Sequence, residues 1–279
     1  MAAEWIHPTA IIDPRAQLGP SVSVGAYSVI GPEVTLGAGC QVGHHVVLEG
    51  AVSVGERCRI GHGAIIGGAP QDLKHREGTL SGVKIGAESV IREYVTVHRA
   101  TRENGWTEIG QHCLIMASSH IAHDCQIGNH VIIINYAGLT GHVRVDDRAT
   151  VGGLSGIHPF ARIGTYAYIG GCSKVNQDVP PFVIVDGVPA TARSVNVIGL
   201  RRGGVGVEDR RLIDAAFRIL YRSGLAPASA VRRIREELTP TPFITRLVEF
   251  VETSKLGIVG PHRPVAGSEV PEAEEERIF

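Results

Sequence analysis

The sequence predicts a mainly β protein, built as a parallel β-helix that is followed by a small α-helical domain. An aliphatic residue recurs every six positions through three stretches, 6–66, 85–97 and 109–175, and all 26 positions hold Ile, Leu or Val. This period is lost after about Val195, where apolar spacings typical of amphipathic helices replace it. The two patterns together place the repeat first and the helices after it.

A six-residue unit is too short for a helix and lacks the continuous alternation of a long strand, so each unit is predicted to be one short strand and a turn. Such units bury their aliphatic side chains only by stacking on one another. A second, usually small residue follows each aliphatic after four positions. Four of the five cysteines occupy that position and are expected in the core, namely Cys40, Cys58, Cys113 and Cys125. An odd number of cysteines without CxxC pairs indicates neither a disulfide framework nor a cysteine-zinc site.

This pattern resembles the hexapeptide-repeat proteins, whose fold is a left-handed parallel β-helix with three units per coil. The resemblance implies the left hand, 18 residues per coil and, in enzymes of this class, a homotrimer with active sites in clefts between prisms. About nine coils at roughly 4.8 Å each would give a prism on the order of 40 Å long.

The carboxy-terminal part carries helix signals. A helix is expected over 207–223 and ends before Gly224, a second over 228–238, and a third from Thr241-Pro242 to about Leu256. The expected organisation is a β-helix domain at 1–194, a helical domain at 195–258 and a disordered, acidic, proline-rich tail at 259–279.

Composition narrows the function classes. A net charge of −1 argues against a general nucleic-acid binder, because neutralising phosphates requires an excess of Lys and Arg. No secretory signal and no apolar run of bilayer length is recognised, so no membrane span and a cytoplasmic location are expected.

The stretch SSHIAHDC at 118–125 is the strongest candidate site. His123 is the third residue of its unit and points outward, and a neighbouring carboxylate, Asp124, suits a general base that must be oriented. Residues 18 apart stack at one strand spacing, so Gly141 should lie beside His123 and His142 beside Asp124.

Two other interpretations of this stretch stay open at this point. Outward histidines on a solenoid are commonly solvent-exposed side chains without a catalytic role. His120, His123 and His142 could instead bind zinc, which accepts three His ligands and a water. Such a site would resemble the γ-class carbonic anhydrases, but nothing in the spacing demands a metal, and none is expected.

Several motifs together resemble the UDP-N-acetylglucosamine acyltransferases of lipid A biosynthesis. They run in order from His7 to about residue 257: QDLK at 71–74, VTVHR at 95–99, HIAHDC at 120–125, AGLTGHV at 137–143, IGGCSKVNQDVPPFVI at 169–184, VNVIGLRR at 195–202 and YRSG at 221–224. The resemblance implies transfer of an (R)-3-hydroxyacyl group from acyl carrier protein to the glucosamine 3-hydroxyl of UDP-N-acetylglucosamine, without a cofactor.

The same resemblance assigns residue roles. His123 would be the general base, Asp124 would orient it, and the Gly141 N–H would hold the oxyanion. The positions implied to contact the sugar or the pantetheine arm are Asp72, Lys74, His98, His120, His142 and His158. Asn196 and Arg202 would hold the nucleotide end. Gly171 stands at the hydrocarbon ruler position, where the lack of a side chain leaves room for a longer acyl chain.

The chain also departs from the common pattern at Pro159, Pro189 and Ile198, which leaves open whether the acceptor bears a 3-hydroxyl or a 3-amino group. The segment from Arg193 to Arg235 contains ten arginines and only three acidic residues. Such a basic region suits binding of the acidic acyl carrier protein. The N-acyltransferase of the same pathway is an alternative, but it carries an extra amino-terminal domain for which a repeat beginning at Ile6 leaves no room. A non-catalytic trimeric scaffold is the alternative from a different class.

Overall fold

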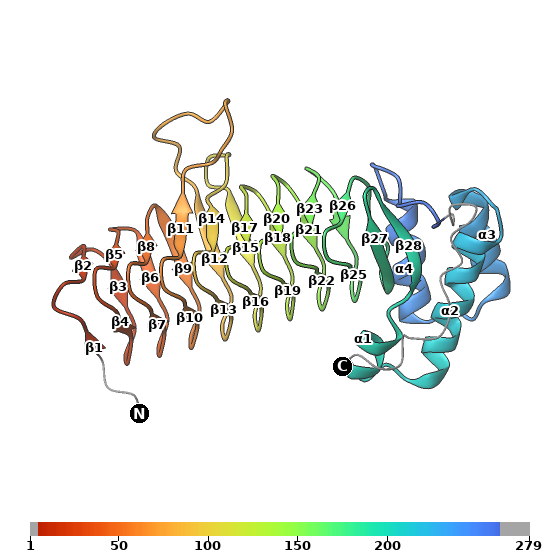
Figure 1. Cartoon of the computed structure of the whole chain (residues 1–279), viewed down its shortest axis with the longest axis horizontal. Coiled ribbons are helices and arrows are strands. Elements are labelled where there is room, and N and C mark those ends of the chain that lie inside the picture. The colour runs from red at the N-terminus through yellow and green to blue at the C-terminus, as the bar shows by residue number, and fades with distance from the viewer. Residues whose placement is uncertain (1–4, 263–279) are drawn as a thin grey trace.

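The computed structural model describes residues 5–262, and its strands form three sheets that run along the molecule as the faces of a left-handed prism (Figure 1). Sheet A contains β1 (Trp5–Ile6), β4 (Ser23–Val24), β7 (Gln41–Val42), β10 (Arg59–Ile60), β13 (Val90–Ile91), β16 (Leu114–Ile115), β19 (Ile132–Ile133), β22 (Thr150–Val151), β25 (Tyr168–Ile169), β27 (Val183–Gly187) and β28 (Ala190–Val195). Sheet B contains β2 (Ile11–Ile12), β5 (Val29–Ile30), β8 (Val47–Leu48), β11 (Ile65–Gly68), β14 (Thr96–His98), β17 (His120–Ile121), β20 (Gly138–Leu139), β23 (Gly156–Ile157) and β26 (Lys174–Val175). Sheet C contains β3 (Gln17–Leu18), β6 (Val34–Leu36), β9 (Ala51–Val54), β12 (Gly82–Ile85), β15 (Trp106–Ile109), β18 (Gln126–Ile127), β21 (Arg144–Val145) and β24 (Arg162–Ile163).

The register confirms the predicted β-helix. Strands pair in parallel with the strand one coil away, so that Ile121 lies over Leu139 and Leu139 over Ile157. These aliphatic side chains are buried inside the prism, as are the four cysteines predicted to be there. The residues at the turns adopt a left-handed backbone conformation, with φ of +59° at Asp124 and +63° at His142. Asp and His tolerate this region better than most residues, and it turns the chain sharply from one face to the next.

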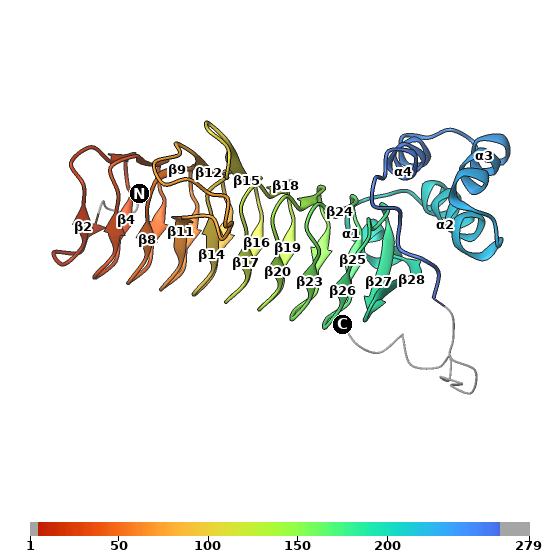
Figure 2. The same cartoon turned by 90° about the horizontal axis from the view of Figure 1, so that it is seen from above.

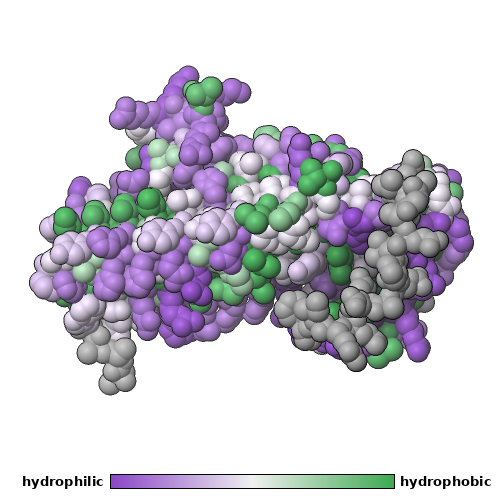
Figure 3. All heavy atoms as spheres, in the orientation of Figure 1, coloured by the Kyte–Doolittle hydropathy of each residue, from purple (hydrophilic) through white to green (hydrophobic). Residues whose placement is uncertain are grey.

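The two breaks in the six-residue period are loops, and both leave the prism where the chain passes from sheet B to sheet C. Residues 69–81 connect β11 to β12, and residues 99–105 connect β14 to β15, on the same side of the prism (Figure 1). The loops are bonded together, since the Asn104 N–H donates to the Leu80 carbonyl at 2.7 Å and the Ser81 hydroxyl donates to the Ala100 carbonyl at 2.5 Å. The first loop protrudes and is largely hydrophilic (Figure 3).

The helices pack beyond the last coil, at the end of the prism opposite β1 (Figures 1 and 2). They are α1 (Val197–Arg202), α2 (Val207–Arg222), α3 (Pro227–Glu237) and α4 (Pro242–Glu252). The three helices predicted from the sequence are confirmed, and the Thr241 hydroxyl accepts from the Ile244 N–H as the expected N-cap. The third ends at Glu252, before Leu256, where Thr253 leaves the helical conformation at φ −92° and ψ 0° and its hydroxyl donates to the Glu249 carbonyl.

Three features at this end lay outside the repeat. The short helix α1 was not predicted, and β27 and β28 form an antiparallel hairpin that extends sheet A. After α4 the chain returns to the prism, where Val259 is 1% exposed and its N–H donates to the Asp178 carbonyl. Residues 259–262, assigned to the tail in the sequence, therefore pack against the folded body. The rest of the expected tail, 263–279, lies outside the described residues, and the division into domains at residue 194 stays a prediction.

Candidate active site

One edge of the prism carries most of the predicted site residues. We call it the B–C edge, the line of five successive segments at which the chain passes from sheet B to sheet C: 69–81, 99–105, 122–125, 140–143 and 158–161. Because each coil returns to this edge, segments far apart in the sequence lie one above another. The edge therefore brings together Asp72, Lys74, His123, Asp124, Gly141, His142 and His158, while His98 and His120 flank it on sheet B.

His123 and Asp124 form a bonded pair at the middle of the edge. His123 Nδ1 lies 2.9 Å from Asp124 Oδ2, and the carboxylate side chain is only 3% exposed. The same oxygen accepts from the Thr101 hydroxyl at 2.7 Å and from the Thr101 N–H at 3.1 Å. Because an ionised carboxylate only accepts, His123 carries its proton on Nδ1 in this pairing, and Nε2 is left as the basic atom.

The pKa of Asp124 is shifted by opposing effects. Burial disfavours its charge, but the hydrogen bonds from the Thr101 hydroxyl, from His123 and from the Thr101 N–H outweigh burial and lower the pKa. Asp124 therefore stays ionised near neutral pH, which is the state that can orient an imidazole and stabilise an imidazolium.

Gly141 lies directly against the His123 ring, as the coil length predicted. A Cβ at position 141 would stand 2.4 Å from His123 Cε1 and 2.7 Å from Nε2, so any side chain there would force the ring out of its place. A backbone hydrogen bond holds the two turns together at this point, because the His142 N–H donates to the His123 carbonyl at 3.0 Å. Glycine is thus required here by close approach of the ring.

The Gly141 N–H is available to a ligand. At other turns this N–H donates to a side chain one coil further on, as the Asn129 N–H does to Asp147 Oδ1 at 2.7 Å. The residue one coil beyond Gly141 is Pro159, whose side chain has no acceptor. Among residues 5–262 no hydrogen bond is found for the Gly141 N–H. A backbone donor next to a basic imidazole nitrogen is the arrangement that oxyanion stabilisation needs.

His142 lies beside Asp124, the second stacking prediction. Its Nε2 is 3.7 Å from Asp124 Oδ2, and its ring meets His123 edge-on and stacks face to face on Phe160 at 4.6 Å. Partial burial lowers the pKa of His142, while the charges of Asp124 and of Asp72 act in the opposite direction.

His98 and His120 form a second pair, on sheet B next to His123. Their rings meet edge-on at 4.7 Å, and His120 Nδ1 lies 2.7 Å from the Thr96 hydroxyl. Burial lowers the pKa of both imidazoles, to about 4 for His98, where the charges of His120 and His123 add to the effect. Both rings are therefore neutral near pH 7 and can donate and accept hydrogen bonds.

The remaining predicted residues take different places. Lys74 lies in the 69–81 loop, where its N–H donates to Asp72 Oδ1 at 2.8 Å. His158 is exposed one coil beyond Thr140, with Nδ1 3.0 Å from the Pro159 carbonyl oxygen. Both residues lie on the B–C edge. Within residues 5–262, no hydrogen bond joins either side chain to His123.

Asn196, Arg202 and Gly171 lie away from this edge. Asn196 is 8% exposed and caps α1, since its side chain accepts from the Gly199 N–H and donates to the Tyr166 carbonyl at 2.8 Å. Arg202 ends α1 and is exposed. Gly171 lies in the turn between sheet A and sheet B, where a Cβ would meet only the Gly153 carbonyl oxygen, at 3.4 Å. The roles assigned to these three residues stay predictions.

The histidine zinc site weighed from the sequence is not assembled. Within residues 5–262 the group whose ligand atoms lie within 4.8 Å of one another is His123, Asp124 and His142. His120 is not part of it, because that ring is directed to Thr96 and His98. The described residues therefore do not form the three-histidine zinc site that the carbonic-anhydrase interpretation requires.

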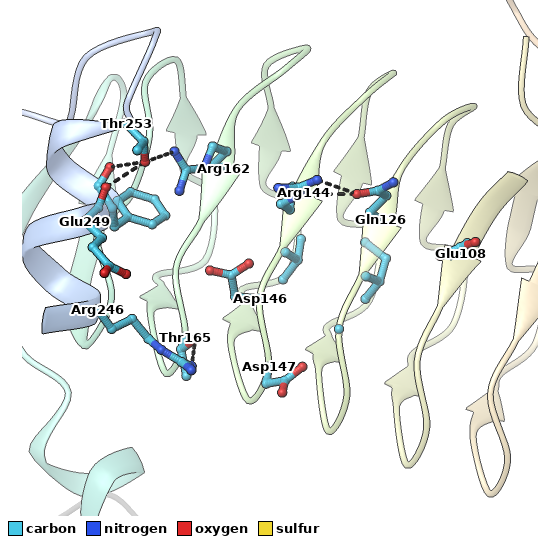
Figure 4. Close-up of a pocket in the computed structure, with 14 residues that line it drawn as sticks. Glu108, Gln126, Arg144, Asp146, Asp147, Arg162, Thr165, Arg246, Glu249 and Thr253 are labelled. Carbon is cyan, nitrogen blue, oxygen red and sulfur yellow. Dashed lines mark hydrogen bonds between the residues drawn. The ribbon is translucent and has the colours of Figure 1, made fainter. Parts of the chain in front are cut away.

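Two adjoining clefts extend from the edge towards the helices. One, of about 660 Å³, begins at His142, Asp124, Arg102 and Phe160 and continues past Arg144 and Arg162 to Lys255. The other, of about 650 Å³, lies between sheet C and α4 (Figure 4). Figure 4 shows Arg246 bonded to Thr165 and Arg162 bonded to Thr253 across this second cleft.

Sequence reasoning missed Thr101, Phe160 and Arg102. Thr101 and Arg102 lie in a loop that breaks the six-residue period, so coil arithmetic could not place them beside Asp124. Phe160 was within reach of that arithmetic, since it stands 18 residues after His142 and stacks on it.

Comparison with known proteins places the chain among similar sequences and structures. Residues 178–259 match the family model described as Udp N-acetylglucosamine O-acyltransferase; Domain 2, and residues 33–68 and 107–141 match the bacterial transferase hexapeptide model. The acyl-[acyl-carrier-protein]–UDP-N-acetylglucosamine O-acyltransferase of Aquifex aeolicus is 56% identical over 259 residues, which cover 92% of this chain and 99% of that protein. The enzyme of the same name from Thermodesulfovibrio yellowstonii is 47% identical, over 91% of this chain and 98% of its own.

Solved structures agree with the sequence relatives. The LpxA structure from Acinetobacter baumannii superposes with a TM-score of 0.88 at 41% identity and covers 92% of this chain and all of that one. The UDP-N-acetylglucosamine acyltransferase of Arabidopsis gives a TM-score of 0.82 at 35% identity, over 91% and 99% of the two chains. The likeness therefore spans the prism and the helices together.

Proposed function

The chain belongs to the UDP-N-acetylglucosamine O-acyltransferase family, and on that basis we propose that it transfers an (R)-3-hydroxyacyl group from acyl carrier protein to the 3-position of UDP-N-acetylglucosamine. This is the first step of lipid A biosynthesis, and we place it in the cytoplasm. Within residues 5–262 no helix is long and apolar enough to cross a membrane. The observation that carries the proposal is the His123–Asp124 pair with the Gly141 N–H beside it.

The chemistry begins with proton removal. Nε2 of His123 takes the proton of the sugar 3-hydroxyl while the hydroxyl oxygen bonds to the thioester carbonyl carbon. Asp124, bonded to Nδ1, stabilises the imidazolium that forms. The resulting tetrahedral intermediate carries a negative oxygen, which accepts a hydrogen bond from the Gly141 N–H.

Collapse of the intermediate completes the transfer. The carbonyl re-forms, the carbon–sulfur bond breaks, and the phosphopantetheine thiolate leaves with the electron pair. The imidazolium then returns its proton from Nε2 to the sulfur. Because a thiolate is a good leaving group, one base and one oxyanion donor are chemically sufficient, and no cofactor is invoked.

The residues around the pair suit an uncharged sugar. His98, His120 and His142 all have lowered pKa values because of burial, so each offers neutral donor and acceptor nitrogens to hydroxyl and amide groups. Asp72, Lys74 and His158 lie along the same edge and would contact the sugar or the pantetheine arm. The acceptor variant, 3-hydroxyl or 3-amino, depends on this part of the site.

The acyl chain would cross the face of sheet B towards Gly171. Gly138 and Gly156 lie side by side on that face, next to His120, and a Cβ on either would meet nothing within 4 Å. The face is therefore open between the base and the turn that holds Gly171. This supports Gly171 as the ruler and a preference for a longer chain.

The acyl carrier protein would dock on the arginine-rich helical region. Of the ten arginines between 193 and 235, five have no ion pair in the described part of the chain: Arg201, Arg202, Arg210, Arg222 and Arg232. Unpaired guanidinium groups on one region attract an acidic partner and raise its association rate.

A homotrimer is part of the proposal. A column of large exposed side chains, interrupted by His45, Gly63 and Ser118, runs along the edge between sheets A and B, with residues 60–67% exposed at Tyr27, Tyr94, Tyr136 and Leu154. Contact with a second copy would cover this column. In one chain, α1 lies beyond the last coil, so Asn196 and Arg202 would reach the nucleotide of a substrate bound at His123 most directly from a neighbouring subunit.

The proposal is tested with purified protein, UDP-N-acetylglucosamine or its 3-amino analogue, and (R)-3-hydroxyacyl carrier proteins of several chain lengths. Acylated nucleotide sugar is detected by mass spectrometry. One donor and acceptor pair should turn over with kcat/KM far above the others. Failure to acylate either acceptor with any donor length would leave the scaffold interpretation as the better one.

A further inference from the structure

We propose that Thr101 is a positioning residue of the acyl transfer, because it holds the catalytic Asp124 in the rotamer that fixes the proton of His123 on Nδ1. The inference rests on the proposed function, in which His123 is the base. It concerns a residue in the loop 99–105, which interrupts the six-residue period immediately above the catalytic turn.

The contacts of Asp124 are strongly asymmetric. Oδ2 receives three short contacts, from the Thr101 hydroxyl at 2.7 Å, the Thr101 N–H at 3.1 Å and His123 Nδ1 at 2.9 Å. Oδ1 is buried and has no hydrogen-bond partner in the described part of the chain. Its nearest charged neighbour is the exposed Arg102 side chain, with Nε 3.9 Å away.

Because of this asymmetry, Oδ2 alone accepts the hydrogen bond from His123, and Thr101 is the residue that holds Oδ2 in place. A carboxylate can turn about its Cβ–Cγ bond and exchange its two oxygens. Two hydrogen bonds from Thr101 to Oδ2 resist that rotation, because every orientation between the two equivalent half-turn positions breaks both of them. With the carboxylate fixed, Nδ1 of His123 meets an acceptor at one position only, and Nε2 stays free to accept the substrate proton.

The loop is itself anchored well enough to serve this purpose. The hydroxyl of Thr107, which is fully buried on β15 just after the loop, accepts from the Asp124 N–H at 2.9 Å, so Asp124 is held by its backbone as well as its side chain. Ala100, next to Thr101, is buried and its carbonyl accepts from the Ser81 hydroxyl. The position of Thr101 is thus determined on both sides.

Three substitutions separate positioning from packing. Thr101→Val keeps the shape and the N–H but removes the hydroxyl donor, and Thr101→Ser restores the hydroxyl without the methyl group. Thr35→Val is the matched control, since Thr35 is an exposed threonine on β6, several coils away. Losing one hydrogen bond to a charged group predicts a kcat roughly ten- to a hundredfold lower for Thr101→Val. The KM for UDP-N-acetylglucosamine should change little, Thr101→Ser should recover most of the activity, and Thr35→Val should behave as the wild type.

A spectroscopic measurement tests the inference independently of turnover. The nitrogen-15 shifts of His123 in the intact protein report which ring nitrogen carries the proton. The wild type, Thr101→Ser and Thr35→Val should have the proton on Nδ1, and Thr101→Val should have a mixture of both tautomers. An unchanged tautomer in a folded Thr101→Val protein, or a valine variant as active as the wild type, would overturn the inference. A protein that acylates neither acceptor but shows the tautomer change would overturn the proposed function and leave standing the effect of Thr101 on the Asp124–His123 pair.

Discussion

Replacing Gly141 by alanine should disable the base without unfolding the prism. The added Cβ would lie 2.4 Å from His123 Cε1, whereas an ordinary contact is about 3.4 Å, so the ring must retreat by roughly 1 Å. That shift stretches the 2.9 Å bond from Nδ1 to Asp124 and moves Nε2 away from the substrate hydroxyl. A misplacement of this size at a reacting group costs about a hundredfold in rate, or roughly 3 kcal/mol in the barrier.

The assay is steady-state acyl transfer followed by mass spectrometry of the nucleotide sugar. We expect kcat to fall about a hundredfold or more while the KM for UDP-N-acetylglucosamine changes little, because the ring moves and the rest of the edge does not. Gly260→Ala is the control, since a Cβ there would meet nothing within 4 Å. Wild-type kcat in a folded Gly141→Ala protein would refute the close packing of this backbone against the base.

The other predictions concern the ruler, the nucleotide end and the response to pH. Gly171→Met should shift the preferred acyl chain to a shorter length in the donor panel, with Gly260→Met as the control, and an unchanged chain-length profile would rule out the ruler. Arg202→Ala should raise the KM for UDP-N-acetylglucosamine roughly tenfold through loss of a charge-assisted contact. Arg211→Ala is the control and should leave this KM unchanged, because the Arg211 guanidinium is paired with Glu208. The same KM in both variants would exclude Arg202 from the nucleotide site. The pKa of His98 falls to about 4 because of burial, below its unfolded value of about 6.5, so the unfolded chain takes up the proton first and stability is lost as the pH falls between these values. After discounting for solvent screening, the difference in unfolding free energy between pH 7 and 5 should shrink by on the order of 1 kcal/mol in His98→Gln, as measured by urea denaturation, and an undiminished difference would contradict a neutral, buried His98.

The six-residue period was sufficient to predict the β-helix, because every coil needs aliphatic side chains that stack on those of the next coil. Ile121, Leu139 and Ile157 each need an aliphatic neighbour one coil away, so a six-residue count places them without further information. The same count placed Gly141 against His123 and His142 against Asp124. Where the chain leaves the repeat, local signals still worked if they were capping signals, as at Thr241.

The parts that could not be predicted depend on contacts without a period. Thr101 reaches Asp124 from a loop whose path is set by its bonds to the neighbouring loop, and no spacing in the sequence encodes that path. The return of Val259 to the prism is a long-range contact of the same kind, whereas the hairpin of β27 and β28 is a local pairing that the six-residue count does not describe. Asn196 was assigned to nucleotide binding by resemblance, and its side chain also proves to cap α1.

Acyl transfer by wild type and His123→Ala, compared side by side, tests the central claim most directly. Both proteins would be given UDP-N-acetylglucosamine and the preferred (R)-3-hydroxyacyl carrier protein, with product identified by mass spectrometry and folding checked by circular dichroism. The account predicts O-acylated UDP-N-acetylglucosamine from the wild type and a kcat at least about a thousandfold lower from His123→Ala, as expected when a general base with an orienting carboxylate is removed. Full turnover by a folded His123→Ala protein would contradict it.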